Sequence, residues 1–231
     1  MTNHSLGSEL NECLRSTHVI DSSNPQIIQF AQSVAAGESN DSDRGVALHY
    51  AVRDGVRYDP YSVDLSVSGM RASNTLPRKL GFCVPKTVLL AAAARALRIP
   101  NRLGFADVKN DLATERLLNM MQRDLFVLHG YTELYLSRRS VKATPAFNRS
   151  LRERLDVDPL AFDGIHDSVF QPPDASGNQF MQYVNDRGAF ADIPLQEMQL
   201  ALERHYPSLI SGGNDSIRGS FNGDAISGSR R

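Results

Sequence analysis

Residues 81–97 read GFCVPKTVLLAAAARAL, the most apolar helical pattern in the chain. Over residues 84–97 the apolar side chains lie on nearly all sides of a helix, which predicts a helix buried in the centre of the molecule. Pro85 suits the first helical turn, and Pro100 ends the pattern because proline cannot continue a helix. Cys83 is therefore expected at the N-terminus of a buried helix.

This position of Cys83 favours a thiolate. Unpaired backbone N–H groups and the helix dipole stabilise negative charge at a helix N-terminus, and the same groups suit an oxyanion. Arg78, Lys79 and Lys86 lie nearby in the sequence. We therefore predict a pKa of Cys83 well below the ordinary value of about 8.5 and a nucleophilic sulfur. The alternative is a cysteine that only packs in the core.

A second pattern of interest is LHGYTELYL, residues 128–136. Alternation along a strand places four side chains on one face: His129, Tyr131, Glu133 and Tyr135. His129 is a candidate base for Cys83, and the alternative is a structural histidine. Glu133 lies about 13 Å along the strand from His129, so we interpret it as an anchor of the sheet. Asp107, at the end of another expected strand near the cleft, is interpreted as a solvated loop acid, with substrate binding as the alternative.

Periodicity and turn residues predict the remaining elements. We expect helices over about 25–36, 43–56, 111–121 and 194–206, and strands over 102–108, 126–136 and 141–144. Residues 61–82 are expected to form a loop, and a pair of strands is expected near Val169 and residues 181–184. Helices followed by strands around one main core predict an α+β fold.

The composition changes along the chain and suggests four parts. We expect a loose N-terminal arm over residues 1–23, a core over 24–150, and a C-terminal extension packed on the core over 151–210. The Gly- and Ser-rich residues 211–231 are expected to be a disordered tail, because few apolar side chains are present to offset the ordering entropy.

Four blocks together resemble the transglutaminase-like superfamily, over about residues 43–148. They are ALHYAVRDGVRYDP (47–60), GFCVPKTVLLAAAARALRIPNRLGFADV (81–108), LHGYTELYL (128–136) and VKATPAFN (141–148). The resemblance implies a papain-like core with N-terminal helices, in which a central helix bearing the cysteine packs on a small antiparallel sheet bearing the histidine. It also implies that Cys83 is the nucleophile and that His129 is the general base and acid.

One position departs from the family. The family usually has an aspartate shortly before a proline as the third catalytic residue, and here that slot holds Thr144, before Pro145. A threonine hydroxyl can accept a hydrogen bond from the imidazole and fix its tautomer. It carries no charge, so it stabilises an imidazolium less than a carboxylate would.

Two other residues compete with Thr144 as the orienting group. If the hairpin turn centres on Arg138-Arg139, Asn148 lies opposite His129, and an asparagine is chemically suited to orient a histidine. Asp163, in the C-terminal extension, is the third candidate. We favour Thr144, because Pro145 limits regular strand pairing as far as residue 148.

Composition and charge exclude several classes of protein. With 25 Lys and Arg against 26 Asp and Glu, the formal charge of −1 provides no basic field for nucleic acid or an anionic membrane. The longest apolar run, residues 88–94, is too short to span a membrane. Two cysteines, Cys13 and Cys83, do not make a disulfide scaffold, and the first residues lack the pattern of a signal peptide. We therefore expect a cytoplasmic protein with reduced thiols.

The expected function is that of a cysteine enzyme that cleaves or transfers an amide through a thioester, of the protease, amidase or transglutaminase type. Its substrate would be a peptide, a protein or a small amide. No cofactor is expected, and no metal, because HExxH and CxxC patterns are absent from the sequence. The alternative is a binding or scaffold protein that keeps the fold without turnover. The sequence leaves the oligomeric state open.

Overall fold

The computed structural model describes residues 10–110, 113–154, 158, 160–169, 181–207, 221 and 224. The helices are α2 (Pro25–Val34), α3 (Asp41–Gly55), α4 (Val67–Met70), α5 (Ala72–Arg78), α6 (Cys83–Ala96), α7 (Glu115–Met121), α8 (Arg149–Arg154) and α9 (Leu195–His205). The strands are β1 (Arg57–Tyr58), β2 (Leu80–Gly81), β3 (Asn101–Asn110), β4 (Leu125–Leu136), β5 (Arg139–Ala143) and β6 (Met181–Phe190).

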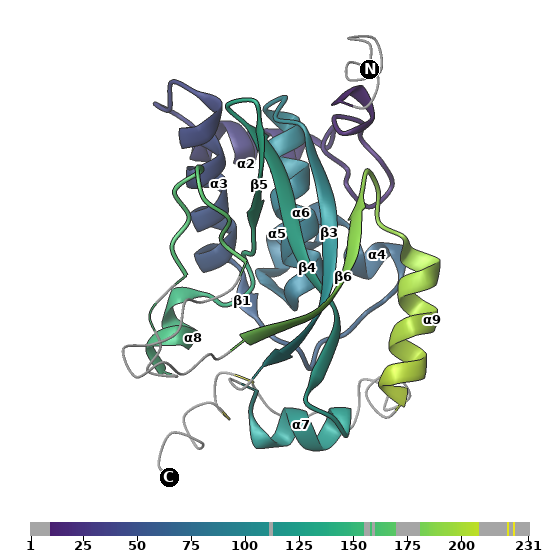
Figure 1. Ribbon diagram of the computed structural model, residues 1–231. Helices are drawn as coiled ribbons and strands as arrows, with labels where there is room; N and C mark the ends of the chain where they lie inside the picture. Colours follow the sequence, from purple (N-terminus) through teal and green to yellow (C-terminus); the bar gives the residue numbers. More distant parts are fainter. Residues whose placement is uncertain are drawn as a thin grey trace.

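Helix α6 forms the centre of the fold. All of its residues from Val84 to Arg95 are buried. One side of α6 contacts β3 and β4, and α2, α3 and α5 pack around its other sides (Figure 1). The central buried helix predicted from the apolar run is therefore confirmed. The N-cap residue of α6, Phe82, makes no side-chain capping bond.

Within the described residues, the main sheet has four antiparallel strands in the order β5-β4-β3-β6. The predicted α+β architecture, with helices packed on a small antiparallel sheet, is confirmed. Strand β6 pairs with β3, so the part of the chain after residue 150 contributes a strand to the core sheet. The expected pairing of residues 181–184 with Val169 is wrong, since Ser168 instead bridges to Ala143 beside β5.

The segment 61–82 also differs from its prediction as a loop. It contains α4, α5 and β2, and Met70, Ala72 and Thr75 are buried. Helix α4 begins at a side-chain cap, in which Ser66 accepts a hydrogen bond from the backbone of Gly69 at 2.9 Å. Glycine, asparagine and proline indicated a loop in this segment, but packing against α6 outweighed those local preferences.

The β4–β5 hairpin turns through Ser137 and Arg138, both with left-handed φ angles, of 48° and 65°. Leu136 pairs with Arg139, as in a two-residue turn whose twist matches that of the strands. The turn predicted at Arg138-Arg139 is therefore misplaced. In the observed register Glu133 pairs with Lys142 and not with Thr144, and continuing it would place residue 146, not Asn148, opposite His129.

The described residues of the two termini contact the core. Ile20 is fully buried, and Arg95 donates a hydrogen bond to the carbonyl of Arg15 at 2.6 Å. Near the C-terminus, the ring of Phe221 packs on Tyr58 and Tyr61. Apart from residues 221 and 224, the predicted tail lies outside the described residues, as do the first nine residues of the predicted arm, so the division into four parts stays a prediction.

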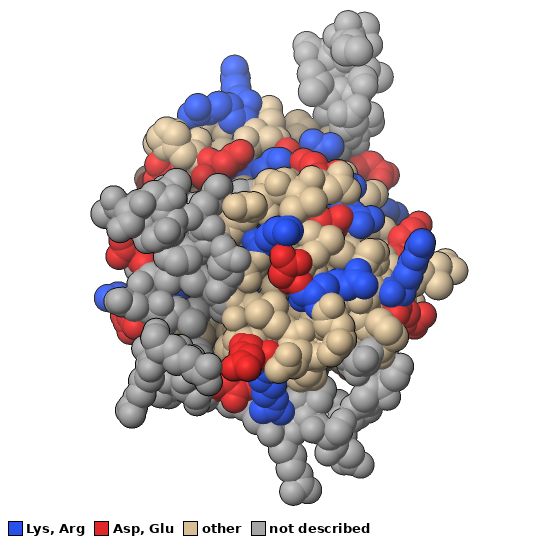
Figure 2. Space-filling view, turned by 60° about the horizontal axis from the view of Figure 1, so that its bottom comes forward, with Lys and Arg blue, Asp and Glu red and all other residues tan. Residues whose placement is uncertain are grey.

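Two surface properties bear on the expected partners. On the face shown in Figure 2, acidic and basic side chains are interspersed among uncharged ones. In the part of the chain that the structure describes, no helix has both the length and the hydropathy needed to cross a membrane.

His49 on α3 provides a test of the core. It is fully buried against the rings of Tyr50 and Phe162, and neither ring nitrogen has a hydrogen-bond partner. Burial lowers its pKa from 6.5 to about 3. Between these pH values only the unfolded chain binds the proton, so His49 lowers the stability of the fold as the pH falls below 6.5.

We predict that His49→Leu raises the free energy of unfolding at pH 7, because it removes a buried polar ring without partners. At pH 5 the advantage over the wild-type protein should grow by about 2 kcal/mol, since one pKa unit corresponds to about 1.4 kcal/mol. Urea denaturation at both pH values measures the difference. Equal pH dependence in the two proteins would contradict the assigned protonation.

Candidate active site

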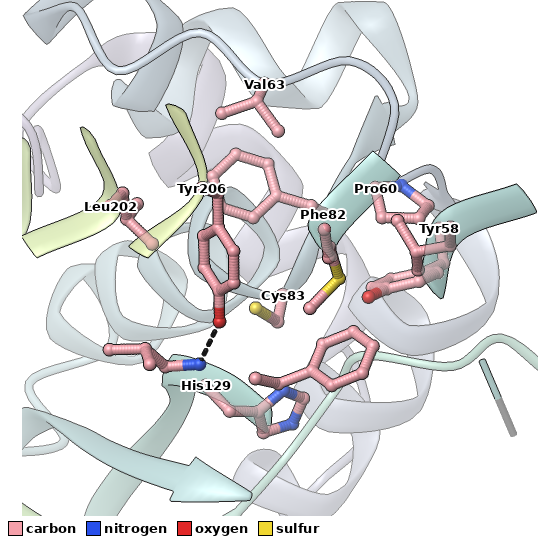
Figure 3. A pocket seen from close by; sticks show the side chains of 12 residues that line it. Tyr58, Pro60, Val63, Phe82, Cys83, His129, Leu202 and Tyr206 are labelled. Atoms are coloured by element: carbon pink, nitrogen blue, oxygen red, sulfur yellow. Dashed lines mark hydrogen bonds between the residues drawn. The ribbon is translucent and has the colours of Figure 1, made fainter. Parts of the chain in front are cut away.

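Cys83 and His129 line the same small cavity, which has a volume of about 60 Å³. In Figure 3 the Cys83 sulfur lies above the His129 ring, with Tyr206 on one side and Tyr58 on the other. The remaining wall is apolar and comes from β1, α7, β4, α9 and the loops between them; it includes Val63, Leu117, Met121, Phe126 and Leu202. The structure thus brings the two predicted catalytic residues to one cavity at the N-terminus of α6.

The electrostatics of Cys83 differ from the prediction. The residue is partly buried, and burial raises the pKa of its thiol to about 11. The backbone N–H groups of Gly130, Val84 and Cys83 itself act in the opposite direction, but they do not outweigh the burial. The prediction of a lowered pKa is therefore wrong, because the helix N-terminus contributes only partial charge while desolvation penalises the whole thiolate.

Two of the basic residues near Cys83 in the sequence, Lys86 and Arg78, bind backbone carbonyls elsewhere. Lys86 is fully buried and donates hydrogen bonds to the carbonyls of Arg53, at 2.8 Å, and Val56. Arg78 donates to the carbonyls of Gly69 and Asn74. Although Lys86 and Arg78 are close to Cys83 in the sequence, they therefore do not place positive charge against its sulfur.

His129 is buried on β4, and burial lowers the pKa of its imidazole to about 4. The ring is therefore neutral at pH 7. A neutral imidazole can accept a proton, as a general base must. The resting site thus holds a neutral thiol and a neutral imidazole, rather than the thiolate expected from the sequence.

The proposed orienting residue, Thr144, lies just beyond the end of β5. It is buried, and its backbone N–H donates to the carbonyl of Ser168 at 2.9 Å. Its hydroxyl has no hydrogen-bond partner, and neither has Nε2 of His129. The Thr144 hydroxyl and His129 Nε2 are both buried and unpaired, so each can still take up a hydrogen-bond partner.

The two competing residues use their side chains elsewhere. Asn148 accepts a hydrogen bond from the backbone of Tyr58 at 3.1 Å and donates one to Ser150 at 2.7 Å. Asp163 is exposed and accepts a hydrogen bond from Nδ1 of His166 at 2.7 Å. Among the described contacts, neither side chain reaches His129.

Other polar residues of the sheet have structural partners. Glu133 pairs with Arg102 on β3 at 3.3 Å, as expected for a sheet anchor. Tyr206, which the sequence did not single out, accepts a hydrogen bond from the backbone of Val127 (Figure 3). Its hydroxyl also donates to the carbonyl of Leu125. No group of three or more His, Cys, Asp or Glu side chains in the described ranges is placed to hold a metal ion.

A buried helix that opens with a cysteine and packs on an antiparallel sheet bearing a histidine defines the papain-like class of folds. The family model described as the transglutaminase-like superfamily matches residues 28–145, just over half of the chain. The chain belongs to this superfamily.

Two solved structures are similar to the chain. A candidate cysteine protease from Cytophaga hutchinsonii has 19% identity and a TM-score of 0.45, over 58% of this chain and 40% of that one. A candidate protease from Parabacteroides distasonis has 13% identity and a TM-score of 0.39, over 62% of this chain and 26% of that one. The chain therefore spans less than half the length of either. Comparison with curated proteins finds no match.

Proposed function

We propose that this protein is a cysteine enzyme that cleaves or transfers an amide through a thioester on Cys83, with hydrolysis as the favoured outcome. The observation that carries the proposal is the shared cavity of Cys83 and His129 at an uncapped helix N-terminus. The substrate would be a peptide, a protein or a small amide. The apolar wall and small volume of the cavity favour a small apolar group beside the reacting carbonyl.

The reaction follows from the two side chains. The Cys83 sulfur attacks the amide carbonyl while neutral His129 takes the thiol proton. The backbone N–H of Cys83 stabilises the oxyanion of the tetrahedral intermediate. His129 then gives its proton to the leaving amine as the C–N bond breaks, which leaves a thioester.

The second half of the reaction restores the site. His129 removes a proton from water, or from an acceptor amine, which attacks the thioester carbonyl. The C–S bond breaks, and the Cys83 sulfur recovers its proton from the imidazolium. In this scheme Thr144 occupies the place where the family has an aspartate and orients His129 by accepting a hydrogen bond from Nε2. This bond forms during the reaction, since neither atom has a partner in the resting structure.

The second candidate function is a binding or scaffold protein of the same superfamily. Two observations favour it. The pKa of Cys83 is raised to about 11, and the position of the family aspartate holds an uncharged threonine. In this case Cys83 would behave as an ordinary, poorly accessible thiol.

Acetylation by p-nitrophenyl acetate separates the two functions, because the acetyl group is small and apolar. In a Cys13→Ser background, intact-mass spectrometry should detect an acetyl thioester on Cys83 that forms and then disappears with turnover. Cys83→Ala should abolish it. The proposal fails if Cys83 is acetylated no faster than in the urea-unfolded chain, which would support the scaffold function.

A further inference from the structure

The backbone just before His129 is kinked. Leu128 has a φ of 60°, in the left-handed region that residues other than glycine disfavour. At the same point, the pairing of β3 with β4 slips between Ala106 and Val108. Such a bulge changes the direction in which the neighbouring side chains project. The direction of the His129 ring therefore depends on whatever holds this kink.

A buried carboxylate holds the kink from the adjacent strand. Asp107 lies within the slipped part of β3, and its Oδ1 accepts a hydrogen bond from the Leu128 backbone N–H at 3.1 Å. Arg187 on β6 binds the same carboxylate in a bidentate manner, from Nε to Oδ1 and from Nη2 to Oδ2, both at 2.8 Å. Bidentate pairing fixes orientation as well as charge.

The ionisation of Asp107 agrees with this geometry. Burial alone would raise the pKa of Asp107, but the hydrogen bonds from Arg187 and Leu128 outweigh it and hold the pKa below its ordinary value. The expectation of a solvated loop acid at this position is wrong. Asp107 is a buried, charged residue that binds the Leu128 backbone on β4 and the Arg187 side chain on β6.

We propose that Asp107 and Arg187 are positioning residues that aim His129 at Cys83 through the backbone of Leu128. The inference rests on the function proposed above. It assigns a role to strand β6, which supplies Arg187. It also explains how the His129 ring can be oriented through its backbone when no carboxylate binds the ring itself. Loss of the pair leaves the acceptor of the Leu128 N–H without a fixed orientation, so the kink can relax and turn the ring away from the sulfur.

Substitution of Arg187 tests the proposal. Arg187→Met should lower the maximal rate of Cys83 acetylation by about tenfold or more and leave the half-saturating ester concentration unchanged, since small misplacements of a catalytic group are costly. Arg187→Lys keeps the charge without the bidentate geometry and should recover part of the rate. Asp107→Asn keeps an oxygen acceptor for Leu128 that Arg187 can still orient with a hydrogen bond, so its rate should fall between those of the wild-type protein and Arg187→Met.

Arg102→Met is the matched control, because it breaks the Arg102–Glu133 ion pair of the same two central strands away from the bulge. It should leave the rate within about twofold of the wild-type rate after correction for the folded fraction. The proposal is overturned if Arg187→Met behaves like this control, or if its rate falls only with its folded fraction.

Hydrogen exchange tests the pair independently of catalysis. In Arg187→Met the amide proton of Leu128 should exchange about tenfold faster or more, because its acceptor, the Asp107 carboxylate, is no longer held in place by Arg187. The neighbouring amide of Val127, held by Tyr206, should change much less. A wild-type protein without acetylation would defeat the proposed function alone, whereas unchanged exchange at Leu128 would defeat the positioning role.

Discussion

Replacing His129 with glutamine is expected to lower the rate of Cys83 acetylation at pH 7 by about 10²- to 10⁴-fold, the contribution of a well-placed general base. Glutamine is polar and of similar size, but it cannot take the thiol proton. The cavity supplies no substitute base among the described residues, since its other polar groups are tyrosine hydroxyls. The variant thiol would then react only through its own ionisation, with a pKa raised to about 11.

The two proteins should therefore differ in their pH profiles. The pKa of His129 is lowered to about 4, so the wild-type imidazole is available as a base above that pH and the rate should persist into mildly acidic solution. The rate of His129→Gln should instead climb steadily toward high pH. Stopped-flow measurement of p-nitrophenol release gives both profiles.

His49→Leu is the matched control for this variant, because it removes another buried histidine that does not line the cavity. Its acetylation rate should match the wild-type rate. An acetylation rate of His129→Gln within about threefold of the wild-type rate would remove His129 from the mechanism, and the general-base contribution would have to come from elsewhere.

The second large effect is an expected increase in the reactivity of Cys83. Thr144→Asp is expected to raise the rate at which iodoacetamide alkylates Cys83 at pH 7 by about tenfold or more. A carboxylate beside an imidazole raises the pKa of the imidazole by about 1–3 units, which favours transfer of the thiol proton to His129 by the same factor. The position is buried and its hydroxyl has no partner, so the new charge would depend on the imidazolium for stabilisation.

Two further substitutions at this position isolate the cause. Thr144→Asn matches aspartate in shape without its charge and should give no gain, while Thr144→Val removes the hydrogen-bond acceptor and should lower the rate. An NMR titration of the His129 ring should find its pKa moved upward from about 4 in Thr144→Asp alone. An unmoved pKa would mean that Thr144 does not face the ring, and the proposed orienting role would be withdrawn.

The central features of the fold were predictable from local sequence. A helix that is apolar on all sides is stable only in the interior of the protein. The sequence therefore predicted Cys83 at the N-terminus of a buried helix. Alternation around His129 predicted a strand, and the resemblance to the transglutaminase-like superfamily implied the small sheet and a site shared by Cys83 and His129. The helix and strand predictions hold because periodicity is a property of neighbouring residues and does not depend on what lies across the fold.

The features that control reactivity came from contacts distant in sequence. The pKa of Cys83 is set by the groups that remove it from water, whereas Lys86, three residues away, donates to the carbonyls of Arg53 and Val56 at the end of α3. The slip that aims His129 depends on Asp107 and on Arg187 from a strand 80 residues later in the chain. Desolvation and strand partnership are set by tertiary packing, and no local pattern in the chain encodes them.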